Sequence, residues 1–115
     1  MVAASLLFGV LVWSGCGRQA GKVLGQAPRG TPRPVLAVRA GDTPPVVTIE
    51  GKLVEKCPVA GCWFRVQDTT GMIKVDTKAA GFVVTSIPLG KTVTVGGKVQ
   101  TVGEETLIEA TGLRF

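Results

Sequence analysis

The 115-residue sequence contains no histidine and no tyrosine, and aromatic residues make up only 5% of it. Without histidine the chain lacks the commonest general acid–base and the commonest neutral metal ligand. The composition therefore argues against an enzyme and gives no sign of a metal or cofactor. Cysteine is also scarce, with three residues in all. The length is enough for one small domain rather than two.

Only one acidic residue lies before position 46, and that part of the chain holds most of the net charge of +5. Residues 17–45 hold five basic residues and one acidic residue, whereas residues 46–115 hold eight basic and seven acidic residues. A domain close to neutrality lacks the electric field on which phosphate binding usually depends. The charge distribution disfavours a nucleic-acid-binding domain, which stays open as an alternative.

The chain opens with an apolar run over residues 2–13, which is too short to cross a bilayer as a helix and has the length of an export signal. Ser14-Gly15-Cys16 follows at once and resembles the lipobox of bacterial lipoproteins, whose cysteine is acylated and becomes the new N-terminus. The resemblance implies a signal peptide over residues 1–15 and a lipid anchor at Cys16. A plain signal peptide and an unprocessed buried helix are the alternatives. Position 17, directly after the cysteine, is glycine and not the aspartate that often retains lipoproteins at the inner membrane. In a host with two membranes this favours the outer membrane.

Residues 16–45 are rich in glycine, proline, alanine and arginine and show no apolar period. The prolines exclude a long helix or a regular sheet. This composition predicts a disordered tether that holds the following domain clear of the membrane. Within it, residues 35–38 (Val-Leu-Ala-Val) could add a short edge strand.

From residue 46 onward apolar and polar residues alternate, as they do in half-buried strands. The pattern predicts five strands, over residues 46–57, 62–68, 72–77, 91–102 and 106–115. Gly51 and Gly96-Gly97 interrupt two of them and predict the kinks that a small closed barrel needs. The irregular segment 78–90 links the third strand to the fourth. This order predicts an all-β, five-stranded Greek-key barrel of the OB-fold type over residues 46–115.

Two cysteines flank the first predicted hairpin, with Cys57 ending one strand and Cys62 opening the next. If the strands pair there, the two residues lie opposite each other at a separation that allows a disulfide. An exported protein occupies an oxidising compartment in which such a bond persists. A thiol redox pair and a soft-metal site, with Cys57 and Cys62 as ligands, are the alternatives.

A candidate ligand face lies on the second and third predicted strands. Trp63 and Arg65 share one face of the second strand, and Met72 and Lys74 share one face of the third. OB barrels bind ligands across these two strands and the flanking loops. The alternative interpretation is that Trp63 covers the disulfide and that the charged residues belong to a solvated sheet face.

Three motifs carry a resemblance to a known family: Cys57-Pro58-Val59-Ala60-Gly61-Cys62-Trp63-Phe64, a Gly-Phe segment at residues 80–84, and a Gly-Lys-x-Val-x-Val-x-Gly strand at residues 90–97. Together they resemble an uncharacterised family of small exported bacterial domains that are OB-like. The sequence as a whole predicts an exported, lipid-anchored module of the bacterial cell envelope that is not an enzyme. Its expected partners are the membrane, through Cys16, and an envelope protein, peptide or glycan.

Overall fold

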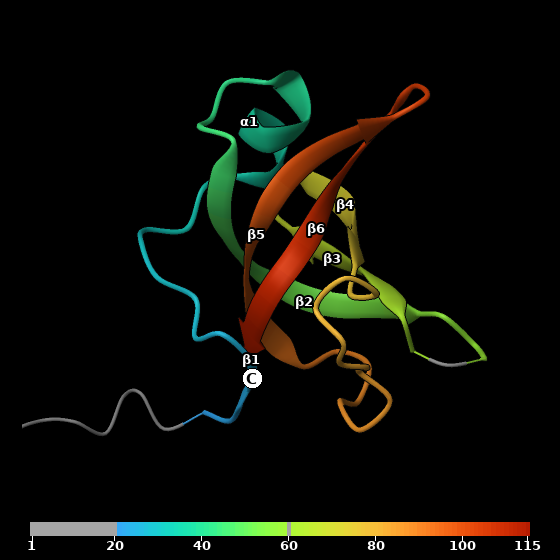
Figure 1. Ribbon diagram of the computed structural model, residues 1–115. Coiled ribbons are helices and arrows are strands. Elements are labelled where there is room, and N and C mark those ends of the chain that lie inside the picture. The colour runs from blue at the N-terminus through green and yellow to red at the C-terminus, as the bar shows by residue number, and fades with distance from the viewer. Residues whose placement is uncertain (1–20, 60) are drawn as a thin grey trace, which may run out of the picture.

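The computed structural model describes residues 21–59 and 61–115 (Figure 1). The predicted signal peptide and Cys16 lie outside these residues. The described chain forms one short helix and six strands, whose bounds are as follows: β1 Val23–Gly25, α1 Val35–Ala40, β2 Val46–Lys56, β3 Trp63–Asp68, β4 Gly71–Asp76, β5 Thr92–Val102 and β6 Glu105–Arg114. The last five strands agree with the five predicted ones to within one residue at each end, which shows how strongly alternation marks half-buried strands.

The five long strands close into a barrel. Strands β2, β3 and β4 form an antiparallel meander, and β5 pairs with both β2 and β6 in antiparallel fashion. Strand β6 then runs parallel to β4 and completes the circle. This is the strand order of the predicted OB-type barrel, so the predicted fold is confirmed.

The barrel interior is filled by one side chain from every second residue of each strand, as the alternation predicts. Phe64 and Val66 of β3, for example, are fully buried, while Arg65 between them is not. The other fully or almost fully buried strand residues are Ile49, Leu53, Ile73, Val75, Val93, Val95, Ile108, Ala110 and Leu113.

The kinks fall partly where they were predicted. The β5–β6 register shifts at Gly97, where an added Cβ would lie 2.3 Å from the backbone oxygen of Glu109. In β2 the extra residue of the bulge is Val54, because Leu53 pairs with Val66 and Glu55 pairs with Arg65. Gly51 instead permits a close approach, since a Cβ there would lie 2.5 Å from the backbone oxygen of Gln67.

Residues 21–45 correct the prediction of a disordered tether, because they lie against the barrel. Strand β1 pairs with residues 112–114 of β6, beyond the point at which β4 stops pairing. The N-terminal segment can approach β6 this closely only because residue 112 is glycine, since a Cβ there would lie 1.6 Å from the backbone oxygen of Gln26. Pro28 is buried and accepts a hydrogen bond from the Arg114 guanidinium at 3.2 Å.

Residues 35–38 form helix α1 and not the predicted edge strand. Val35 and Val38, three residues apart, lie on one side of the helix and are fully buried in the barrel core. Gly41 ends the helix in the left-handed conformation at φ 81°. Its amide donates to the carbonyl oxygens of Ala37 and Val38. A strand would have placed Val35 and Val38 on opposite faces.

Asp68, in the β3–β4 turn, holds the start of α1. Its carboxylate accepts hydrogen bonds from the amide of Val35 at 2.9 Å and from the amide of Thr70 at 2.7 Å. Partial burial raises the pKa of Asp68, but these bonds, with those from the Thr70 hydroxyl and the Gly71 amide, outweigh it and leave the pKa below its usual value. The ionised carboxylate of Asp68 therefore fixes the start of α1 to the β3–β4 turn.

The other end of the barrel is filled by the link between β4 and β5, residues 77–91. Val84 and Ile87 are fully buried, and the amide of Val84 donates to the oxygen of Gly61 in the β2–β3 loop. The Lys56 ammonium donates to the backbone oxygen of Ile87 at 2.7 Å and fixes the link to β2. Each end of the barrel is thus closed by a segment outside the five strands.

We expect Val38→Ala to lower the free energy of unfolding by about 2 kcal/mol, because it removes two buried methyl groups from the core. Leu36→Ala, on the same helix but with its side chain 61% exposed, is the matched control and should change stability by less than about 0.5 kcal/mol. Chemical denaturation of both variants measures the difference. Equal stability of the two would contradict the docking of α1.

Candidate functional site

The four residues of the predicted ligand face lie together on the outside of the barrel. Trp63 and Arg65 come from β3, and Met72 and Lys74 come from the neighbouring β4. Arg65 pairs directly with Lys74, and Met72 pairs with Gln67 at the α1 end of the same hairpin. Because these positions alternate with buried core residues, the barrel itself holds them outward.

Trp63 is flanked by two cations. The Lys74 ammonium lies 5.1 Å from the centroid of its ring, and the Arg65 guanidinium lies 5.6 Å from it. Both distances are within the range of cation–π attraction. The half-buried indole therefore has two positively charged groups beside its ring. It lies at the start of β3, next to the β2–β3 loop.

Carboxylates neutralise part of this charge. Arg65 forms an ion pair with Glu55 of β2 at 2.9 Å and lies 3.7 Å from the carboxylate of Glu105 at the start of β6. All three side chains are about a third to a half exposed, so these pairs contribute little to stability. They do set the orientation of Arg65 and give the face a mixed charge.

A hollow of about 320 Å³ continues the face toward the β5–β6 turn. Arg39 of α1 forms one wall, and its guanidinium donates to the backbone oxygen of Met72 at 3.3 Å. Glu104 and Glu105 also line the hollow. Sequence reasoning missed these three residues as part of the face, because Arg39 fell in the expected tether and the two glutamates in a turn where charge is common.

The two cysteines of the β2–β3 loop meet, but not across the strand ladder. The amide of Cys57 donates to the oxygen of Trp63, so Cys57 lies opposite Trp63 and not opposite Cys62. The bulge at Val54 accounts for this shift of one residue. The two Sγ atoms are nevertheless 3.8 Å apart, at hydrogen-bonding distance for thiols, and no disulfide joins them in the structure.

The thiol of Cys62 is not activated. Its pKa is raised above the usual value, first by the hydrogen bond with Cys57, then by desolvation and by the charge of Cys57. Reactive thiols in redox enzymes show the opposite shift. Within residues 21–59 and 61–115, no three or more cysteine, aspartate, glutamate or histidine residues are grouped closely enough to hold a metal ion.

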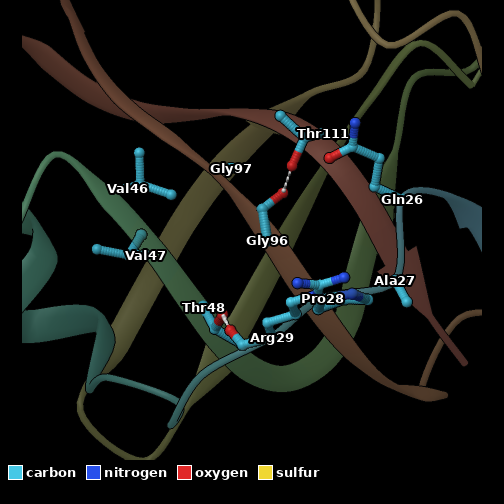
Figure 2. Close-up of a pocket in the computed structure, with 10 residues that line it drawn as sticks. All are labelled: Gln26, Ala27, Pro28, Arg29, Val46, Val47, Thr48, Gly96, Gly97 and Thr111. Atoms are coloured by element: carbon cyan, nitrogen blue, oxygen red, sulfur yellow. Dashed lines mark hydrogen bonds between the residues drawn. The ribbon is translucent and has the colours of Figure 1, made fainter.

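A second hollow, of about 590 Å³, lies under the segment that connects β1 to α1 (Figure 2). Gln26 to Arg29 form one side, and β2 and β5 form the other, at Val46 to Thr48 and at Gly96-Gly97. The hydroxyl of Thr48 donates to the backbone oxygen of Arg29, and that of Thr111 donates to the oxygen of Gly96 at 3.2 Å. The hollow is therefore a seam between the N-terminal segment and the barrel.

Comparison with solved structures shows a similarity of fold. The chain resembles the hypothetical protein ygiW from E. coli with a TM-score of 0.57 and 19% sequence identity, over 76% of this chain and 94% of that one. The barrel has the OB fold. At this identity the likeness extends to the fold alone. No family model matches the sequence, and no curated protein matches it.

The part of the chain that the structure describes contains no helix long and apolar enough to span a membrane.

We expect Cys57 and Cys62 to be oxidised to a disulfide in protein isolated from an oxidising compartment, because their sulfur atoms already lie 3.8 Å apart. The fragment that contains Cys57 and Cys62 should then have a mass lower by two hydrogen atoms than that of the dithiol, and reduction should restore the higher mass. Cys57→Ser is the control, since it leaves Cys62 without its oxidation partner. Alkylation of both thiols in protein isolated without reductant would contradict the expectation.

Proposed function

We propose that this protein is a non-catalytic binding module of the bacterial cell envelope and that the β3–β4 face holds its ligand. The observation that carries the proposal is the half-buried cluster of Trp63, Arg65 and Lys74, which lies on the surface by which OB barrels bind saccharides and oligonucleotides. An aromatic ring with polar groups beside it suits a sugar ring or a peptide side chain. The expected partner is accordingly an envelope glycan, peptide or protein.

The mixed charge of the face favours such a partner over nucleic acid. Arg65 is bound to Glu55 and approached by Glu105, and the hollow beyond it is lined by two glutamates as well as by Arg39 and Lys74. A strand of nucleic acid would bring phosphates close to these carboxylates. Single-strand binders also present several aromatic platforms in a basic groove, whereas this face offers one tryptophan.

Export and lipid attachment at Cys16 complete the proposal. Their support is the sequence of residues 2–16, an apolar run of signal-peptide length followed by Ser-Gly-Cys. Acylation of Cys16 would leave Cys57 and Cys62 as the pair that is free to oxidise, which accounts for an odd number of cysteines. The outer membrane is the expected destination in a host that has two.

The anchor is tested by the intact mass of the protein extracted from membranes of its host. We expect a chain that begins at Cys16 and carries acyl groups. Cys16→Ala should abolish both the acylation and the cleavage before residue 16, whereas Cys62→Ala should leave both unchanged. A mature chain that lacks acyl groups would refute the anchor and leave the barrel's binding role untouched.

The ligand face is tested by NMR titration of the full chain with chito-oligosaccharide, with a mixed peptide library and with oligothymidylate. We expect saccharide or peptide to shift the indole signal of Trp63 and the amides of Arg65 and Lys74, and Trp63→Ala to weaken binding at least tenfold. Val46→Ala, an exposed residue in the seam under the N-terminal segment, is the matched control. Salt-dependent shifts with oligothymidylate alone would support a nucleic-acid module instead.

A further inference from the structure

The two ends of the barrel differ in charge. The end opposite α1 is built from β1 with its preceding residues, the β2–β3 loop and the β4–β5 link. We call it the basic end: residues 21–25, 56–59, 61–62 and 77–91. These segments contain four lysines, Lys22, Lys56, Lys78 and Lys91, and no acidic residue. Contacts join them, since the amide of Val84 bonds to Gly61, and a Cβ at Gly25 would touch the ring of Phe82.

The α1 end holds four carboxylates and two guanidinium groups, those of Arg33 and Arg39. Asp42 follows the helix, Asp68 lies in the β3–β4 turn, and Glu104 and Glu105 lie at the β5–β6 turn. Figure 1 shows this turn and α1 together at the top of the barrel, and β1 with the link at the bottom. At the α1 end the four carboxylates outnumber the two arginines, so the formal charge differs between the two ends of the barrel.

The lysines of the basic end are largely available to a partner. Within the described residues Lys22 and Lys91 form no ion pair, and both are exposed. Lys78 is 69% exposed and lies 3.8 Å from Asp76, at the limit of an ion pair. Only Lys56 is committed, through its bonds to the backbone of the link.

Exposed apolar side chains accompany these lysines. Val59 is 89% exposed and Leu89 is 60% exposed, and Val23 and Val83 are each nearly half exposed. Leu36 and Val102 are similarly exposed at the α1 end, so apolar exposure alone does not distinguish the two ends. At the basic end they lie in segments that hold four lysines and no acidic residue, whereas at the α1 end Asp42 follows the helix and Glu104 and Glu105 adjoin Val102.

The chain also enters the barrel at this end. Gly21, the first described residue, is followed directly by Lys22, whose amide bonds to the backbone oxygen of Phe115. From Cys16 to Gly21 the chain spans at most about 18 Å, given a reach of about 3.6 Å per residue. With residues 21–45 docked, a lipid at Cys16 would bring the basic end, and not the α1 end, to the bilayer surface.

We propose that the basic end docks on an anionic phospholipid surface, with its lysines against the headgroups and Val59, Val83 and Leu89 at the interface. Basic residues near such a surface are attracted by its negative potential, and each strengthens binding about fivefold. The docked orientation leaves the acidic α1 end pointing away from the lipid and the β3–β4 face along the side of the barrel. The inference extends the proposed envelope location but does not require acylation, because the charges belong to the barrel.

The test compares the partition of the full chain onto vesicles of pure phosphatidylcholine and onto vesicles of equal parts phosphatidylcholine and phosphatidylglycerol. An acyl chain or an uncleaved leader contributes to both partition coefficients, so their ratio isolates the charge-dependent part. We expect Lys78→Gln with Lys91→Gln to lower this ratio at least tenfold. The matched control, Arg33→Gln with Arg39→Gln, removes the same charge near α1 and should change it less than threefold.

Hydrogen exchange on the same vesicles locates the contact. We expect residues 56–59, 61–62 and 78–91 to exchange more slowly on the anionic vesicles than on the neutral ones, and residues 103–106 to exchange equally on both. Equal effects of the two double variants, or protection at residues 103–106, would overturn the proposal, as would a partition ratio of one for the unaltered protein. None of these results depends on whether Cys16 is acylated, which the intact mass decides separately.

Discussion

A five-stranded barrel has two open ends, and the need to close both determines most of this structure. The strands bury their inward side chains against one another, but the core would meet water at each end without a cover. Val35 and Val38 of α1 cover one end, and Val84 and Ile87 of the link cover the other. The segments that lie outside the strands are therefore part of the core.

The strands could be predicted because their constraint is local. Each residue of β3 or β5 alternates between core and solvent, and the sequence records that alternation directly. The docking of residues 21–45 could not be predicted in this way, since only Val35 and Val38 of α1 are buried and no period extends beyond them. A weaker signal was present, with Pro34 before the helix and Gly41 after it, the usual order for helix boundaries.

The candidate site divides in the same manner. Trp63, Arg65, Met72 and Lys74 could be grouped from the sequence because strand pairing places them on one face. Glu55, Glu105 and Arg39 reach that face through the bulge, the closing strand and the helix, which depend on the three-dimensional arrangement. The prediction that Cys57 and Cys62 lie opposite each other was wrong by one residue for the same reason. The extra residue at Val54 shifts the pairing, and the alternation of apolar and polar residues does not reveal it.

The docked N-terminal segment also changes what a lipid anchor could do. A disordered tether of thirty residues would leave the barrel free to turn in any direction, and its surface charges would average out. With β1 fixed to β6 and Gly112 admitting Gln26, the chain reaches the barrel at one defined end. A lipid at Cys16 would then bring the lysines of that end to a negative surface before the carboxylates of the other end, because it could lie no more than about 18 Å from Gly21.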